Sequence, residues 1–315
     1  MMKSKVDLSI IIVNWNTKNL LLNCLDSVFK TIKEISFEIW VVDNGSTDGS
    51  IEAVKYKFPS VKIIRNKKNL GFARANNQAL KRINGRYAVL LNTDTVLTDG
   101  ALEKIFFFME KNPKVGICGG QLLNEDGTKQ RCFGKIPTLT TDLLNKNLLE
   151  MLFPKRYFSK RRKYEIPTEV ESITGACMVV RKKAIDEVGL LDENFFFYYE
   201  ETDWCYRMRN KGWKVFYHPH AYIYHFRGKS TEEVKNKAII EFWKSRYKFF
   251  KKHYGDRKKI FLEIGLVVKL ITNIFLYSFL TAGTFLNKKI TIRLKRCVYL
   301  LIWHIKGKPE KYGLS

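Results

Sequence analysis

Residues 8–14 read Leu-Ser-Ile-Ile-Ile-Val-Asn, and residues 39–46 read Ile-Trp-Val-Val-Asp-Asn-Gly-Ser. Each stretch is a short apolar run, rich in β-branched residues, that stops at a polar side chain. This pattern is typical of a strand buried on both faces of a parallel sheet. Between the two runs, apolar residues from Leu21 to Ile32 recur at helical spacing. The order β-α-β predicts an open α/β sheet in which the first run is a central strand.

The alternation of strand and helix continues beyond this unit. We expect helices at 50–58, about 73–83 and 101–111, and strands at 61–64, 87–91 and 115–120. From about 124 to 168 the pattern is irregular, with three prolines and a basic cluster at 160–163, which indicates a mobile loop. A strand at 173–180 and a helix that contains residues 201–205 complete the pattern, and a charged, aromatic-rich helix is expected at 231–253.

Composition and charge limit the class of protein. Of the 315 residues, 45% are hydrophobic and 14% are aromatic, which excludes an intrinsically disordered or collagenous chain. The 56 Lys and Arg outnumber the 31 Asp and Glu, for a net charge of +25, and residues 229–315 hold 20 of the basic but only 6 of the acidic residues. This asymmetry favours a polyanionic partner, which is either nucleic acid or an anionic membrane surface.

The C-terminal part of the chain combines apolar stretches with basic flanks. Leu270–Asn287 is 18 residues long and uncharged, and five basic residues follow between Lys288 and Arg296. A membrane-spanning helix needs about 20 mostly apolar residues, so a spanning helix, interfacial helices and a packed helical pair all stay open. We favour interfacial helices. The expected domains are 1–230 and a helical, membrane-associating extension at 231–315.

Two features indicate a reducing, cytoplasmic location. The six cysteines include no Cys-x-x-Cys pair, as expected of reduced core residues. The first apolar run is too short for the core of a signal peptide. Together with the basic, apolar C-terminal part, these features predict a protein at the inner face of the cell membrane.

Aspartates follow two of the expected strands. Asp43 comes directly after Val41-Val42, and Asp94 follows Leu90-Leu91 by three residues. Ligands of open α/β sheets bind beyond the carboxyl ends of the strands. One carboxylate there can accept a hydrogen bond from a nucleobase or ribose, and another can hold a divalent cation on a diphosphate. The alternative is that both aspartates only cap helices.

An acidic cluster follows an aromatic run. Residues 195–199 are all Phe or Tyr, and Glu200, Glu201 and Asp203 come directly after them. Aromatic neighbours would partly desolvate a carboxylate and raise its pKa toward the value that a general base needs. His218 and His220, in contrast, are expected to be ordinary core or surface residues.

Five motifs carry a resemblance to a known family. They occur in the order found in the family-2 inverting glycosyltransferases, and the chain most resembles the rhamnosyltransferase branch. The similar region covers residues 7–230. The motifs are Val41–Ser50, Asn69–Asn77, Leu91–Thr95, Thr174–Ala176 and Asp192–Cys205.

The resemblance implies a GT-A fold, which is a Rossmann-like open mixed sheet flanked by helices, and a nucleotide-sugar site. Asp43 is similar to the family's base-binding aspartate. Asp94 matches the last residue of the Asp-x-Asp metal motif, and Asn92 stands at its first position, so a bound Mg²⁺ or Mn²⁺ would have one carboxylate fewer. His225 is similar to the family's late histidine near the diphosphate. The residues expected to bind the donor are Asn14, Asp43, Asn69, Gly71, Arg74, Asn92 and Asp94, with Asp94 and His225 on the metal.

The resemblance also implies the residues that act on the acceptor. Glu201 stands where the family usually has its aspartate base, so either Glu201 or Asp203 abstracts the proton. Gly175, Ala176 and Glu200 are expected to contact the acceptor, and the 124–168 loop to shape its site.

We therefore interpret the chain as an inverting hexosyltransferase. The expected donor is dTDP-rhamnose or a UDP-sugar, and the expected acceptor is a hydroxyl of a lipid-linked or cell-surface polysaccharide. One alternative is a basic nucleic-acid-binding protein, which is disfavoured because most of the basic excess flanks apolar segments. Nucleic acid is therefore not an expected partner. A catalytically inactive scaffold is the other alternative, and the presence of Asp43, Asp94 and the acidic cluster disfavours it.

Overall fold

The computed structural model describes residues 6–144, 149, 151–153, 164–226, 235–283 and 287–314. The chain forms two compact units, one of residues 1–136 and 163–233 and the other of residues 137–162 and 234–315. The expected boundary near residue 230 therefore differs from this division in one segment, because 137–162 groups with the C-terminal helices. The basic cluster at 160–163 lies outside the described residues.

A mixed nine-stranded sheet forms the centre of the first unit. The strands of this unit are β1 (Leu8–Asn14), β2 (Phe37–Asp43), β3 (Lys62–Arg65), β4 (Tyr87–Asn92), β5 (Thr95–Leu97), β6 (Val115–Leu123), β7 (Phe133–Gly134), β8 (Thr168–Glu169), β9 (Ser172–Ile173), β10 (Cys177–Arg181) and β11 (Lys214–His225). The order in the sheet is β3-β2-β1-β4-β10-β6-β11-β5, with β8 paired to β11 and a separate two-stranded sheet of β7 and β9. The four strands β3, β2, β1 and β4 are parallel, and β10 is antiparallel to both β4 and β6.

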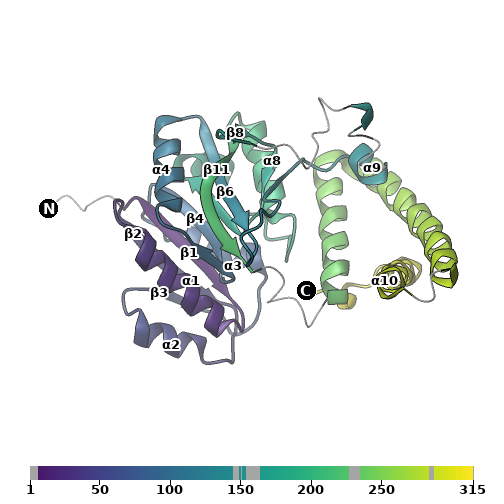
Figure 1. Cartoon of the computed structure of the whole chain (residues 1–315), viewed down its shortest axis with the longest axis horizontal. Helices are drawn as coiled ribbons and strands as arrows, with labels where there is room; N and C mark the ends of the chain where they lie inside the picture. Colours follow the sequence, from purple (N-terminus) through teal and green to yellow (C-terminus); the bar gives the residue numbers. More distant parts are fainter. Residues whose placement is uncertain are drawn as a thin grey trace. The chain divides into compact units, whose positions relative to one another are not determined.

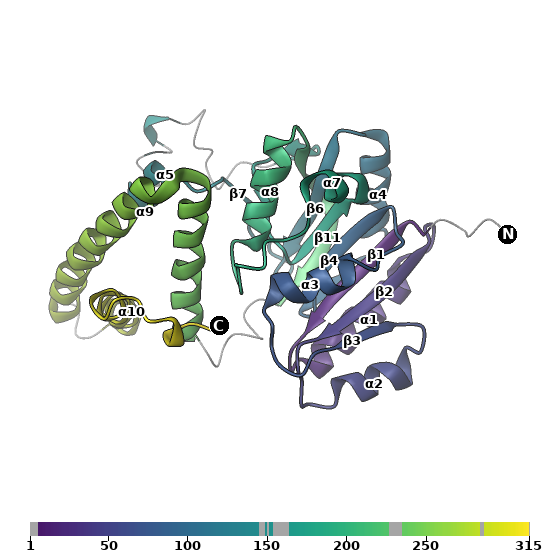
Figure 2. The same ribbon diagram turned by 180° about the vertical axis from the view of Figure 1, so that it is seen from behind.

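Helices cover both faces of this sheet. They are α1 (Lys18–Thr31), α2 (Ser50–Lys57), α3 (Phe72–Leu80), α4 (Ala101–Lys111), α7 (Lys182–Val188) and α8 (Glu200–Asn210). Helices α1 and α4 lie in front of the sheet in Figure 1, whereas α3, α7 and α8 lie in front of it in Figure 2, which is seen from behind. Leu8, Ile10, Ile11 and Ile12 of β1 are fully buried between these layers. The prediction of a central strand buried on both faces is confirmed.

The structure corrects two parts of the expected pattern. The single strand predicted at 173–180 is wrong, because β9 and β10 are separate strands joined by a turn at Thr174–Ala176. The 12-residue strand β11 was not predicted. It contains Pro219, and a proline within a run of residues argues against predicting a strand there, because proline cannot donate a hydrogen bond to the sheet. The pairing of β11 with β6 shifts register between His218 and Tyr222, so this proline lies in an irregularity of the ladder.

The second unit is helical. It contains α5 (Leu139–Leu143), α9 (Lys235–Gly283), α10 (Lys288–Ile305) and the short 3₁₀ helix η2 (Glu310–Tyr312). Helix α9 bends at Gly255, whose φ is +83°, and Figure 1 shows the two arms on either side of the bend. Arg246 of α9 donates to the buried carboxylate of Asp142 on α5, at 2.9 Å from Nε to Oδ2. This pair explains why residues near 142 group with the C-terminal helices.

Helix α9 also contains residues 270–283 of the apolar stretch noted in the sequence, and residues 284–286 lie outside the described residues. Within Asn236–Thr281, one 18-residue window has a mean hydropathy of 1.9, and only 17% of it is buried. Among the described residues this is the one helix whose length and composition would allow it to cross a membrane. The first four residues of the charged helix predicted at 231–253 lie outside the described residues.

Candidate functional site

The carboxyl ends of β1 and β2 place Asn14 opposite Asp43. The Asn14 Nδ2 atom donates to Asp43 Oδ1 at 3.1 Å, and it also lies 2.8 Å from the Ser50 hydroxyl. The backbone N–H of Ser46 donates to the other carboxylate oxygen, Oδ2, at 3.3 Å. Asp43 is only 1% exposed. The carboxylate is therefore held in one orientation at the strand end, which suits a group that recognises a planar base.

The segment around Gly71 packs against the aromatic run before α8. Gly71 has a φ of +85°, and a Cβ atom at this position would lie 2.5 Å from the carbonyl oxygen of Phe196. The N–H of Phe72 donates to the same oxygen at 2.8 Å. Asn69 accepts from the N–H of Gly71 at 2.9 Å and from the Asn44 side chain at 3.2 Å. Only glycine fits here, since it alone tolerates both the conformation and the close approach.

Arg74 lies one turn further along α3, and its Nε donates to Glu193 Oε2 at 3.0 Å. The same glutamate accepts from Asn77 through Oε1 at 3.0 Å. The side chain of Arg74 is half-exposed. In this arrangement Arg74 links α3 to the segment before α8, and its expected contact with the nucleotide stays a prediction.

The end of β4 and the start of β5 place Asp94 beside His225. The N–H of Asn92 donates to Ala176 O at 3.0 Å, so the end of β4 is tied to the Thr174–Ala176 turn. Strand β5 pairs with β11 so that Thr95 faces His225. The Phe226 N–H donates to Asp94 O at 2.9 Å. As a result, Asp94 Oδ1 lies 3.4 Å from His225 Nε2, and both side chains are buried.

Gln130 orients the imidazole of His225. Its amide nitrogen donates to His225 O at 2.5 Å and to Leu123 O at 3.2 Å. The amide oxygen therefore faces His225 Nδ1, at 3.1 Å, and accepts the proton of that nitrogen. Nε2 is then the ring nitrogen that faces Asp94. Gln130 was missed in the sequence because it lies in the irregular 124–168 region, where periodicity gives no signal.

These donors suit a hard divalent cation. Asp94 Oδ1 and His225 Nε2 lie 3.4 Å apart, and a carboxylate oxygen and an imidazole nitrogen are both ligands that divalent cations accept. Among the described residues no group of three His, Cys, Asp or Glu side chains could hold a metal ion. Two protein ligands are still sufficient for Mg²⁺ or Mn²⁺ on a diphosphate, because phosphate oxygens and water complete the shell. Asp94 and His225 thus fit the metal that the sequence predicted.

Glu201 lies in the first turn of α8, and two strained residues come directly before this helix. Tyr198 and Tyr199 have φ values of +67° and +70°, which is a rare conformation for aromatic residues. The Glu201 Oε2 atom is buried and has no hydrogen-bond partner among the described residues. Burial raises the pKa of Glu201 above its usual value. The Thr174–Ala176 turn lies against it, since a Cβ built on Gly175 would be 3.6 Å from Glu201 Cβ.

The other two carboxylates of the acidic cluster, Asp203 and Glu200, have surroundings that differ from those of Glu201. Asp203 is fully buried, and its Oδ2 accepts from Arg207 Nε at 2.7 Å. Arg207 also donates to the carbonyl groups of Val188 and Leu190. The ion pair therefore anchors α8 to the chain before it. Glu200 is buried beside Glu201 at the start of the same helix.

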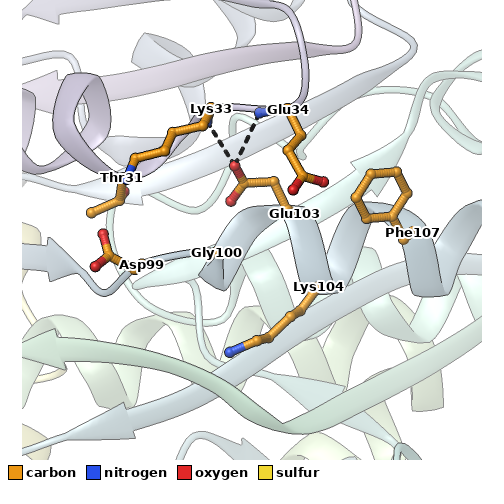
Figure 3. Close-up of a pocket in the computed structure, with 8 residues that line it drawn as sticks. All are labelled: Thr31, Lys33, Glu34, Asp99, Gly100, Glu103, Lys104 and Phe107. Carbon is orange, nitrogen blue, oxygen red and sulfur yellow. Dashed lines mark hydrogen bonds between the residues drawn. The ribbon is translucent and has the colours of Figure 1, made fainter.

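One cavity of about 320 Å³ lies elsewhere on the first unit, between the end of α1 and the start of α4 (Figure 3). Glu103 points into it and accepts from the N–H of Lys33 at 2.8 Å. None of the predicted site residues lines this cavity.

Residues 9–189 match the family model described as glycosyl transferase family 2. The chain belongs to this family. It is 25% identical, over 226 residues, to the N-acetylglucosaminyl-diphospho-decaprenol L-rhamnosyltransferase of Mycobacterium tuberculosis, and the match covers 67% of this chain and 73% of the relative. The protein is therefore a rhamnosyltransferase-like family-2 glycosyltransferase.

Solved structures show that the fold is GT-A. The mannosyltransferase PcManGT of Pyrobaculum calidifontis, in complex with GDP-Man and Mn²⁺, superposes with a TM-score of 0.55 at 13% identity, covering 96% of this chain and 87% of that one. GalNAc-T7 with UDP, GalNAc and Mn²⁺ also superposes with a TM-score of 0.55, at 18% identity, over 70% of this chain and 44% of that chain. The expected α/β fold is confirmed.

Proposed function

We propose that this glycosyltransferase inverts the anomeric centre of a sugar that it transfers from a nucleoside diphosphate to an acceptor hydroxyl. The observation that carries the proposal is Glu201, a carboxylate whose Oε2 is buried without a partner among the described residues. It lies against the turn that binds the end of β4, and Asp94 follows that strand end by two residues. A proton acceptor and a diphosphate site thus converge on one edge of the sheet.

The proposed reaction is a single displacement. The acceptor oxygen forms a bond to the anomeric carbon while Glu201 takes the hydroxyl proton. The bond from that carbon to the diphosphate breaks, and the diphosphate leaves with the electron pair. Asp43 orients the base, and Asp94 with His225 holds the diphosphate end. When bound there, Mg²⁺ or Mn²⁺ would neutralise the charge of the leaving group.

Two arguments favour Glu201 over Asp203 as the base. Asp203 is engaged by Arg207 at 2.7 Å, which stabilises the charged form and leaves a poor proton acceptor. The pKa of Glu201 is raised by burial, which makes it the stronger base of the two. Gly175, Ala176 and Glu200 surround this carboxylate or its helix, and we assign them to the acceptor side.

The relatives support a choice of donor and acceptor. The mycobacterial relative is named as a rhamnosyltransferase acting on a diphospho-decaprenol-linked sugar. We therefore propose dTDP-rhamnose as the donor, with a UDP-sugar as the alternative, and a lipid-linked polysaccharide precursor as the acceptor. An acceptor of this kind lies in a membrane, so we place the enzyme in the cytoplasm, at the inner face of the cell membrane.

Product stereochemistry tests the proposal. The full chain is incubated with Mn²⁺, a panel of nucleotide sugars and an N-acetylglucosaminyl diphosphate lipid, and the anomeric configuration of the product is determined by proton NMR. We expect transfer from one donor, with the configuration opposite to that of the donor. A product that retains the donor configuration would rule out the single displacement.

A further inference from the structure

The second arm of α9 carries an exposed apolar stripe. Its largest members, Phe275 and Phe279, are 74% and 78% exposed. The stripe runs from residue 260 to residue 279, which is about 30 Å of helix at 1.5 Å per residue. Successive members are mostly three or four positions apart, so they share one side of the helix. The stripe consists of Ile260, Phe261, Ile264, Val268, Ile271, Phe275, Leu276 and Phe279.

The opposite side of this arm is packed within its own unit. Leu262, Leu266 and Leu270 are buried at intervals of four residues. A Cβ on Gly265 would lie 2.6 Å from a side-chain atom of Leu143 on α5, so the two helices are in close contact. The arm is therefore apolar on two sides. One side is covered by α5 and its neighbours, and the other is exposed.

The two charged residues between positions 260 and 279 both have partners within the second unit. Glu263 accepts from Lys308 Nζ at 2.7 Å and from Lys259 Nζ at 3.1 Å. Lys269 donates to Asp142 O at 3.1 Å. To span a bilayer, the arm would have to break these contacts or carry both charges into hydrocarbon, which costs several kcal/mol per charge. Contact of one side with a membrane surface leaves every one of them intact.

The charge of the second unit favours an anionic surface as the partner of the stripe. The second unit holds 25 Lys and Arg against 6 Asp and Glu, a net charge of +19 out of +25 for the whole chain. The exposed side of α10 mixes basic and apolar residues, with Lys288 and Lys295 on the same helix as Ile302 and Ile305, and the exposed Lys306 follows directly after it. A second copy of this unit would bring the same positive charge and be repelled. An anionic bilayer offers both negative headgroups and an apolar interior.

We propose that the stripe on α9 binds an anionic membrane surface with the helix axis in the membrane plane, and that the basic residues of α10 contact the headgroups. This inference deepens the proposed function, because it names the surface that would hold the enzyme beside a lipid-linked acceptor. It also decides among the three alternatives for the C-terminal stretch in favour of interfacial helices.

Vesicle binding tests the surface. The full chain is sedimented with vesicles of phosphatidylglycerol and phosphatidylcholine, and UDP binding with Mn²⁺ is measured on the same preparations. We expect Phe275→Glu with Phe279→Glu to lower the partition coefficient by about tenfold or more, since two anchors are replaced by charges. Tyr56→Glu, at a residue 93% exposed on the first unit, is the matched control and should bind like the wild type.

A second variant pair tests the charge, because Lys288→Glu with Lys295→Glu should weaken binding to the anionic vesicles only. Alkaline carbonate should release the wild type from vesicles, whereas a requirement for detergent would overturn the in-plane orientation. Equal binding by the stripe variant and Tyr56→Glu, or tighter binding to duplex DNA than to vesicles, would overturn the assigned partner. If the wild type does not bind vesicles but still binds UDP, the membrane surface is wrong and the proposed function stands. If the wild type binds vesicles but no nucleoside diphosphate, the proposed function is wrong and the membrane surface stands.

Discussion

At the scale of single residues, Glu201, the proton acceptor that we propose, lies in an unfavourable environment for a carboxylate. Glu201→Gln keeps the shape of the side chain but cannot take a proton, so we expect kcat to fall by roughly 10²–10⁴. Binding of nucleoside diphosphate should be unchanged. Steady-state kinetics and calorimetric titration with UDP or dTDP give both values. Full turnover by this variant would move the role to Asp203.

The same substitution should stabilise the fold at neutral pH. The pKa of Glu201 is raised above its ordinary value of 4.5 by burial. The folded state therefore binds the proton more tightly than the unfolded state, and the free energy of unfolding falls as pH rises from below 4.5 through the raised pKa. The amide of the Glu201→Gln variant does not titrate. The melting temperature of the variant should therefore be higher than that of the wild type at pH 7 and equal to it at pH 4. In the wild type, activity should be lost as pH falls through the same raised pKa.

Gln130 should act on the metal through His225. Gln130→Leu removes the acceptor of the Nδ1 proton, so the imidazole can rotate or change tautomer, and we expect Mn²⁺ affinity to fall by roughly 10–100-fold. Electron paramagnetic resonance of Mn²⁺ in the presence of UDP measures this affinity directly. As a control, Asp43→Ala should weaken UDP binding both with and without Mn²⁺. If Gln130→Leu binds Mn²⁺ as the wild type does, the hydrogen bond has no positioning role.

At the scale of elements, the contact between α3 and the run before α8 depends on one glycine. Gly71→Ala combines a positive φ with a Cβ at 2.5 Å from Phe196 O, and we expect it to lower stability by about 1–3 kcal/mol and to reduce kcat. Gly189 provides the comparison, because its φ of +89° and ψ of 177° are nearly those of Gly71 but nothing lies within 4 Å of its Cβ position. Gly189→Ala should show the conformational penalty alone. Equal melting temperatures of the two variants would show that the close approach has no energetic effect.

The elements also show what the sequence could predict. Strands β1, β2 and β4 were found because they are short, mostly buried apolar runs, and the polar ends of the first two, Asn14 and Asp43, were found with them. Strand β11 was not found because Pro219 interrupts its alternation of apolar and polar residues. Only the pairing with β6 shows that the sheet tolerates this proline, through a shift of register between His218 and Tyr222. The break at Gly175 was hidden because β9 and β10 are both apolar. Similarly, nothing local indicates that Gln130 meets His225, since 95 residues separate them.

At the scale of the whole molecule, the chain divides into a unit that carries the candidate site and a unit that carries most of the charge. A chain shortened to end at Gly255 keeps the first unit but loses α10, whose Trp303 stacks on Tyr247 with 6.4 Å between ring centroids. We expect this chain to retain the rise in melting temperature that UDP and Mn²⁺ produce, because ligand binding stabilises the unit that binds it. It should also aggregate more readily. Differential scanning calorimetry with and without UDP measures the first effect, and its loss would show that the two units do not fold independently.

The position of β10 has a consequence for how this enzyme diversifies. This antiparallel strand lies between β4 and β6 in the sheet. Asn14 and Asp43, which we propose bind the nucleotide base, precede it in the chain, whereas Gly175 and Glu201 come from the turn before it and from helix α8 after it. The two halves of the site meet directly, because Asp94 lies 3.4 Å from His225 and the N–H of Phe72 donates to Phe196 O. A recombination point in the loop between β5 and α4 would separate both pairs, so we expect acceptor preference to change only by exchange of segments that keep these contacts.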